Sequence, residues 1–247
     1  MSKVLLFAIF VATGFAQSGP PLPDLIVDSR ALSQYLKIRT EKFTSTQCDA
    51  VEDGISSGSH LVMRFTVSTP NIGDAPLVVG DPNVHYNLND GLFEFAPCHH
   101  HFHFRHYATY ELVDPITQYV WRAAKRGFCM IDVSKYQGSS GPNNVKPVFT
   151  ACGSPGVPGN QGVSPGFADV YDWQLQGQYF VLDGGDGQPV VKPGVYRLRI
   201  TVNPKFLPGG DPCPYPDPVF TDFCHQLPES EYGNNVTEIT VTVPSNK

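Results

Sequence analysis

The chain has 247 residues, of which 41% are hydrophobic and 16% are charged. A chain of this length can bury one sizeable core, so a single domain is expected. Its 23 glycines and 23 prolines are high for a helical protein, and its formal net charge of −6 gives no basic footprint for nucleic acid.

The first 16 residues have the pattern of a secretory signal peptide. One lysine, Lys3, precedes an apolar run of about a dozen residues, and small residues surround Ala16. The run is too short to span a membrane, and no second long apolar run follows it. We therefore expect cleavage after Ala16 and a single secreted, extracellular domain, residues 17–247, without a membrane span.

The rest of the sequence predicts a mainly β protein, an antiparallel β-sandwich with long loops and little helix. Only residues 29–43 suggest a helix, and it is short. Runs that alternate apolar and polar residues between turn signals follow at 60–71, 106–114, 118–124, 194–204 and 237–243. Such runs are typical of strands that turn one face to a core.

Five histidines crowd into eight positions: His99, His100, His101, His103 and His106. On an extended strand the first, third and fourth of these project to one side. Three imidazoles on one side can converge on one ion if the strand bends, and imidazole suits copper, zinc, nickel and iron. His100 and His106 are expected to support the ligands or to face solvent. A chance histidine run in a surface loop is the alternative.

An oxidising compartment makes an even number of cysteines a candidate disulfide framework. Cys213 and Cys224 lie in one proline-rich excursion, and closure of that loop is the simplest explanation of both. Spacing alone leaves open the partners of the other four cysteines, which are Cys48, Cys98, Cys129 and Cys152.

Six sequence blocks resemble the catalytic domain of the lysyl oxidase family. In the family's order they are CHHHFHF (98–104), YELVD (110–114), KRGFCMID (125–132), GVSPGFADVYDWQ (162–174), VNPKFLP (202–208) and ESEYGNNV (229–236). The likeness runs from about Asp24 to about Thr242. It implies a copper-dependent amine oxidase whose organic cofactor, lysine tyrosylquinone, is made from the enzyme's own lysine and tyrosine.

The resemblance assigns roles to individual positions. It implies three copper ligands, which are His99, His101 and His103. Lys125 resembles the cofactor lysine and Tyr171 the cofactor tyrosine. Asp169, two residues before that tyrosine, matches an acidic position suspected of being the general base. Without the resemblance each of these residues has an ordinary explanation, because lysines and aspartates are mostly solvated and tyrosines mostly pack.

The resemblance also implies that Cys98 pairs with Cys152, which would hold the histidine strand against the loop that leads to Tyr171. Phe167 and Gly177 stand where animal members carry a second disulfide, so both of its partners are absent together.

Cys48 and Cys129 match cysteines whose usual local partners are here Gly54 and Lys135. Either these two cysteines pair with each other or both are free. Free thiols are unusual in a secreted chain, which favours the pairing.

Hard oxygen ligands at the two ends of the domain resemble a calcium site of the family's fold. The expected ligands are Asp24, the Leu25 carbonyl, Glu229, Glu231, Asn234 and Asn235. An ordinary acidic turn is the alternative. Asn235 also opens the glycosylation sequon 235–237, and a glycan there is incompatible with calcium binding by the same residue.

The resemblance implies oxidative deamination of a primary amine, in the family a peptidyl lysine, to an aldehyde, with O₂ as oxidant and release of ammonia and hydrogen peroxide. We expect no long basic pro-region between the signal and the domain, so small primary amines stay open beside extracellular protein lysines. Two other classes also stay open: a non-catalytic copper-binding module, and a zinc hydrolase using the three histidines. No HExxH motif supports the latter.

Overall fold

The computed structural model describes residues 20–136 and 146–245, and the expected signal peptide lies outside them. Strands dominate the described chain. The helices within it are short: α1 (Ser29–Gln34), α2 (Cys48–Val51) and α3 (Pro82–Leu88). The prediction of a mainly β fold with little helix is confirmed. No helix in these ranges is both long enough and apolar enough to cross a bilayer.

The prediction of a helix over residues 29–43 is correct only for its first half. Asp28 caps α1 by accepting a hydrogen bond from the Arg30 N–H, and the helix ends at Gln34. The second half is strand β1 (Lys37–Phe43), which pairs along its whole length with β2 (Gly58–Arg64). Backbone pairing with a neighbour therefore overrides the local helical pattern.

One layer of the fold is a four-stranded antiparallel sheet in the order β16-β13-β7-β8. Its strands are β16 (Val236–Val243), β13 (Gly194–Val202), β7 (Ala108–Val113) and β8 (Val120–Arg122). Alternate residues of β13 are buried, from Tyr196 to Val202, as the alternating sequence predicts.

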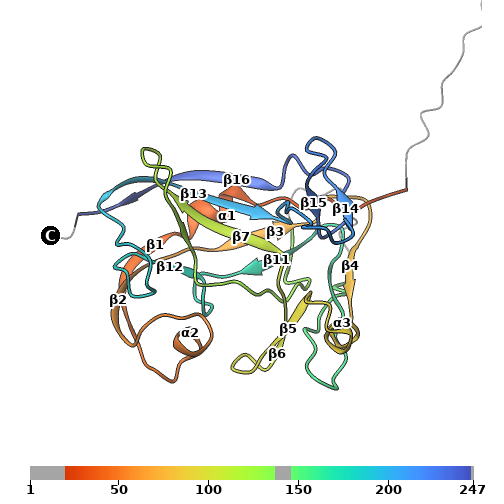
Figure 1. Ribbon diagram of the computed structural model, residues 1–247, viewed down its shortest axis with the longest axis horizontal. Coiled ribbons are helices and arrows are strands. Elements are labelled where there is room, and N and C mark those ends of the chain that lie inside the picture. Colours follow the sequence, from red (N-terminus) through yellow and green to blue (C-terminus); the bar gives the residue numbers. More distant parts are fainter. Residues whose placement is uncertain (1–19, 137–145, 246–247) are drawn as a thin grey trace, which may run out of the picture.

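The facing layer consists of two three-stranded sheets, β1-β2-β12 and β3-β11-β9. The additional strands are β3 (Val67–Pro70), β9 (Ser134–Lys135), β11 (Phe167–Tyr171) and β12 (Tyr179–Val181). Figure 1 shows β11 and β12 below β7 and β13. The core lies between the layers, where Phe65 contacts Tyr110 and Phe180 with ring centroids 5.4 and 5.1 Å away.

Smaller pairs of strands extend from these layers. They are β5 (Phe93–Ala96) with β6 (His101–Phe104), β4 (Leu77–Gly80) with β10 (Gln161–Val163), and β14 (Tyr215–Pro216) with β15 (Cys224–His225). The β5–β6 hairpin lies between α2 and α3 at the lower end of the view in Figure 1. This hairpin carries the histidine run.

All six cysteines form disulfides: Cys48–Cys98, Cys129–Cys152 and Cys213–Cys224. The pairing predicted from the proline-rich loop is confirmed. The expected Cys98–Cys152 and Cys48–Cys129 pairings are wrong, because α2 lies against the hairpin turn and brings the Cys48 Cα within 5.5 Å of the Cys98 Cα. Cys129 is left facing Cys152, with Cα atoms 5.4 Å apart.

Candidate active site

The histidine run forms the tip of the β5–β6 hairpin and the strand that leaves it. His100 sits in the turn with a left-handed φ of 59° and is exposed to solvent. The reversal brings His99 beside the two histidines of β6: its ring centroid is 5.8 Å from that of His101 and 5.2 Å from that of His103. The latter two rings are 4.9 Å apart. The predicted convergence of three imidazoles is therefore present, and His100 turns away.

The protonation of two of the three histidines favours metal binding. Burial lowers the pKa of His101, and burial together with the nearby Lys125 lowers that of His103 to about 3. Neutral imidazole is the form that binds a metal. His99 Nδ1 lies 2.6 Å from Glu52 Oε2, so it donates to this carboxylate and leaves the other ring nitrogen free for an ion.

Three converging imidazoles on one hairpin suit a borderline cation such as copper. As the side chains are placed, no group of three or more His, Cys, Asp or Glu within residues 20–136 and 146–245 could hold a metal ion. The donor set and the Glu52 hydrogen bond fit a copper centre, and the rings would adjust around the ion. His106 is exposed and packs against Phe206 instead, with ring centroids 6.5 Å apart.

Lys125 and Tyr171 meet beside this hairpin although they are remote in sequence. Lys125 follows β8, Tyr171 ends β11, and the lysine Nζ is 4.9 Å from the centre of the tyrosine ring. The ring is buried, and its hydroxyl donates to the Cys129 carbonyl at 3.0 Å. The ammonium lies over Phe128 as well, at 5.5 Å, and this burial lowers the Lys125 pKa.

Asp169 is on β11, two residues before Tyr171, and is 1% exposed. Burial raises its pKa to about 8, although Tyr171 and Lys125 act in the opposite direction. Its Oδ2 atom is buried without a hydrogen-bond partner. The structure thus brings the three residues that sequence predicted for catalysis into one place.

Two carboxylates that sequence reasoning missed complete the site. Glu52 and Asp53 follow α2, which the Cys48–Cys98 disulfide fastens to the hairpin. Glu52 accepts from the Cys98 N–H as well as from His99. Burial raises the Asp53 pKa to about 7, while Lys125 lowers it. The only signal in the sequence was that Cys48 lacks its usual partner at position 54.

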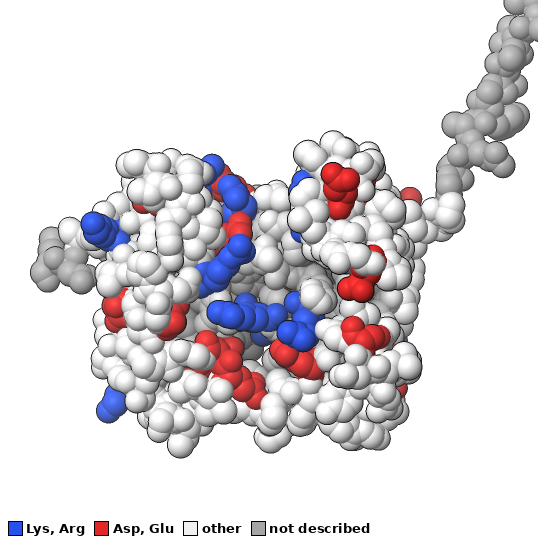
Figure 2. Space-filling model, in the orientation of Figure 1, with Lys and Arg blue, Asp and Glu red and all other residues white. Residues whose placement is uncertain are grey.

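A groove of about 240 Å³ opens onto His99, His103 and Lys125, and its charged walls are Glu52, Asp53, Glu94, Lys125 and Arg126. Tyr171 and Asp169 are buried and do not line it. Figure 2 shows the molecule hollowed at its centre, with cationic side chains inside the hollow and acidic ones on its lower edge. A larger groove of about 630 Å³ lies over the four-stranded sheet beside the 205–225 loop, and none of the predicted copper or cofactor residues lines it. The chemistry therefore points to the smaller groove.

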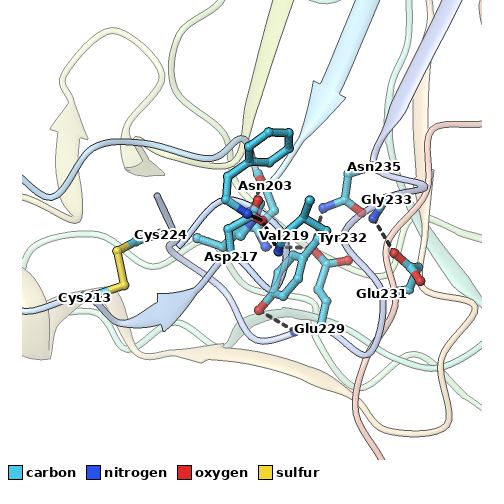
Figure 3. Close-up of polar contacts among 12 residues, drawn as sticks. Asn203, Cys213, Asp217, Val219, Cys224, Glu229, Glu231, Tyr232, Gly233 and Asn235 are labelled. Atoms are coloured by element: carbon cyan, nitrogen blue, oxygen red, sulfur yellow. Dashed lines mark hydrogen bonds and ion pairs between the residues drawn. A yellow bond between two sulfur atoms is a disulfide. The ribbon is translucent and has the colours of Figure 1, made fainter. Parts of the chain in front are cut away.

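The expected calcium ligands also come together, at the start of the chain's described part and before β16. Glu229 is buried, and its carboxylate accepts from Asn203 at 2.6 Å and from Asn235 at 2.8 Å (Figure 3). It also accepts from the Leu25 N–H at 2.5 Å. Burial raises its pKa to about 8. Leu25 contributes its N–H to this cluster, and the role expected of its carbonyl stays a prediction.

Two buried amide oxygens at this second site lack partners, those of Asn234 and Asn235. Asn234 donates to Asp24 at 2.9 Å, and Glu231 lies close enough to raise the Asp24 pKa, after the larger effect of burial. Oxygens without donors beside carboxylates suit calcium. The Asn235 nitrogen, which a glycan would occupy, is buried against Glu229, and this placement argues against glycosylation.

Comparison with known proteins agrees with this geometry. Residues 23–209 match the family model described as Lysyl oxidase. The chain belongs to the lysyl oxidase family. It is 27% identical over 241 residues to Protein-lysine 6-oxidase of Bos taurus. That alignment covers 93% of this chain and 47% of the bovine protein. The Sus scrofa protein of the same name is also 27% identical, with 93% and 79% covered.

Human lysyl oxidase homolog 1 is 28% identical over 203 residues, or 77% of this chain and 31% of its own length. The chain thus spans about half or less of the bovine and human relatives. The match to the lysyl oxidase family contains the histidine hairpin, Lys125 and Tyr171.

Proposed function

We propose that the protein is a secreted, copper- and quinone-dependent amine oxidase. It converts primary amines, chiefly lysine side chains of extracellular proteins, to aldehydes, with O₂ as the oxidant and ammonia and hydrogen peroxide as the other products. The observation that carries this proposal is the placement of the Lys125 Nζ 4.9 Å from the Tyr171 ring centre, beside three converging imidazoles.

His99, His101 and His103 would hold copper, and Glu52 orients the first of them through its Nδ1 hydrogen bond. Bound copper supplies the redox chemistry with O₂ that builds the cofactor, and the resulting quinone acts as the electron sink for the substrate carbon. The lowered pKa values of His101 and His103 keep both rings available to the ion at neutral pH.

Lys125 must be uncharged to bond to the tyrosine ring, because an ammonium has no free electron pair. Burial favours that form. Asp53 and Asp169 are the carboxyl groups that act on its charge, and both have raised pKa values. A proton released from Lys125 therefore has nearby groups that can hold it.

Asp169 is placed to remove the proton from the substrate's α-carbon. It lies on the same strand face as Tyr171, it is shielded from bulk water, and its Oδ2 is free to accept. In its ionised form it takes this proton, and in its protonated form it can return one.

The groove suits a cationic amine substrate. Asp53 and Glu94 face it, and the half-exposed Glu94 lies at its edge. A surface groove of about 240 Å³ can admit a lysine side chain while the rest of a protein stays outside. The relatives named Protein-lysine 6-oxidase support protein lysine as the substrate, and small primary amines would fit the same space.

Amine turnover under air and without oxygen tests this function. Under air, copper-loaded protein should release peroxide and aldehyde in equal amounts from a lysine-containing peptide over many turnovers. Without O₂ it should release no peroxide and at most one aldehyde per cofactor. Copper binding with no peroxide from peptides or small amines would instead identify a non-catalytic copper module.

A further inference from the structure

A small set of buried polar groups lies on the inner side of Lys125 and Tyr171. It consists of Tyr110, Asp169 and Gln178, which are 3%, 1% and 0% exposed. Four of their polar atoms have neither solvent contact nor a hydrogen-bond partner: the tyrosine hydroxyl, the aspartate Oδ2 and both amide atoms of the glutamine. Folded proteins pair nearly all buried polar atoms, so four exceptions in one place require an explanation.

Three different strands or their ends bring these residues together. Tyr110 is in the middle of β7, Asp169 is in β11, and Gln178 directly precedes β12. The neighbours of the glutamine hold the backbone around Lys125. The Gly177 carbonyl accepts from the Lys125 N–H at 2.9 Å, and the Tyr179 carbonyl accepts from the N–H of residue 124 at 3.0 Å. The backbone on both sides of Gln178 is thus hydrogen-bonded to the segment that carries Lys125.

Electrostatic effects link the Tyr110 hydroxyl to both of the other residues. Burial raises the pKa of its hydroxyl, the Asp169 carboxylate raises it further, and the Gln178 amide lowers it. The glutamine is therefore near the hydroxyl, although as placed the two do not complete a hydrogen bond. The groups that face Asp169 are Lys125, Tyr171, Tyr107 and Tyr110.

One arrangement of donors and acceptors satisfies most of the unpaired atoms. The Gln178 amide donates to the Tyr110 oxygen, and the Tyr110 hydroxyl donates to Asp169 Oδ2. This chain pairs three of the four atoms and ends on the carboxylate. Hydrogen bonds in such a series strengthen one another in a dry interior.

We propose that Tyr110 and Gln178 are positioning residues for Asp169, which stabilise its carboxylate and hold its Oδ2 for proton removal. The first part concerns the folded protein alone, and the second rests on the proposed function. Packing is the ordinary explanation of Tyr110, whose ring contacts Phe65 and Phe128. Phenylalanine would serve packing equally well, so Tyr110→Phe separates the two roles.

The carboxyl titration of Asp169 is the first measurement. It is followed by NMR in metal-free, ¹³C-aspartate-labelled full-length protein, and the signal lost in Asp169→Asn assigns it. Tyr110→Phe should move the midpoint about one pH unit above its value of about 8, because the carboxylate loses a donor. Gln178→Leu should move it in the same direction by less, because it removes only the donor that polarises the Tyr110 hydroxyl. Tyr196→Phe is the control, since its hydroxyl donates to the Lys192 carbonyl elsewhere in the same sheet.

The second measurement uses copper-loaded, aerobically matured protein. Both variants should keep the Lys125–Tyr171 crosslink in peptide maps, lower kcat by about tenfold, and move the acidic limb of the pH profile upward. Adding Tyr110→Phe to the Asp169→Asn variant should not lower kcat further, because both substitutions act through the Asp169 carboxylate.

An unchanged Asp169 titration midpoint in both Tyr110→Phe and Gln178→Leu would overturn the proposal. If one of these variants does not fold, the midpoint in the other decides. A shifted midpoint in a protein whose wild type forms no crosslink would support the positioning of Asp169 and reject the oxidase function. The two failures are therefore distinguishable.

Discussion

The ionisable side chains around Tyr171 favour their uncharged forms because they share a pocket with little water. Burial lowers the pKa values of Lys125 and His103 and raises those of Asp53 and Asp169. Each neutral form has a use: an imidazole can bind a metal, and an uncharged amine can bond to the tyrosine ring. Perturbed groups of both signs gathered in one region are typical of a catalytic site.

The ligand assignment predicts a loss of copper on mutation of a single histidine. Wild-type protein should carry about one copper per chain, by the coordination expected of three imidazoles. His101→Ala should remove most of it, while far-UV circular dichroism should show the β fold unchanged, because the core and disulfides do not depend on the ion. His106→Ala is the matched control, since that ring lies apart against Phe206. Copper retained in His101→Ala by elemental analysis would contradict the assignment.

The role of Asp169 as the base predicts how turnover depends on pH and how its replacement changes the rate. A base works only when ionised, and its pKa is raised to about 8, so kcat should rise from pH 6 towards pH 8 and above. Asp169→Asn should keep the crosslink but lower kcat by about 10²-fold or more, the usual contribution of a placed base. Stopped-flow measurement with an α-deuterated amine checks this, since the isotope effect should grow in the variant. A full rate with a flat pH profile would exclude Asp169 as the base.

At the level of elements, α2 and the β5–β6 hairpin form one unit. The Cys48–Cys98 disulfide joins them, and the next residues of the α2 segment place Glu52 on His99. A local disulfide within the α2 segment could not make this connection. Because Cys48 pairs with Cys98 and not with a cysteine nearby in sequence, this disulfide helps to set the orientation of the predicted metal ligand His99.

This coupling predicts weaker copper binding when the hairpin is released. Replacing both Cys48 and Cys98 by serine should lower copper affinity by about 10- to 100-fold, the usual effect of disturbing the groups that orient a ligand. The control pair is Cys213→Ser with Cys224→Ser, which opens a loop away from the histidines. Competition with a copper chelator measures the difference. Equal affinities in the two double variants would contradict the coupling.

The alternation of apolar and polar residues was enough to predict β7, β13 and β16, because each of these strands turns one face to the core. It failed at residues 37–43, where pairing with β2 decides the structure. The resemblance located the histidines, Lys125, Tyr171 and Asp169, since their motifs are local. Glu52 and Asp53 could not be found this way, because their role depends on how a distant helix lies against the hairpin.

At the scale of the whole molecule, the start of the described chain is tied to its last strand. Asp24 and Leu25 contact Asn234 and Glu229, more than 200 positions later. This contact lies at one end of the four-stranded sheet and does not involve the copper hairpin. It joins chain ends that would otherwise fray.

The calcium assignment predicts a stability that depends on the ion. Calcium should raise the melting temperature by binding only the folded state, and chelation should reverse it. Glu229→Gln should remove most of this response, because an amide cannot ionise to bind the cation, as the Glu229 carboxyl can. Lys205→Gln, in the neighbouring groove, is a control that should respond like wild type. Differential scanning calorimetry with and without calcium makes the comparison, and an identical response in Glu229→Gln would reject the site.

The most direct test of the account is mass spectrometry of copper-loaded, aerobically matured protein. Tryptic digestion should yield one crosslinked species that joins the peptides of Lys125 and Tyr171, absorbs visible light and reacts with phenylhydrazine. Lys125→Arg and Tyr171→Phe should each abolish it, since a guanidinium stays charged and a phenyl ring lacks the oxygen needed for a quinone. Separate, unmodified peptides containing Lys125 and Tyr171 from the wild-type protein would contradict the amine oxidase proposal.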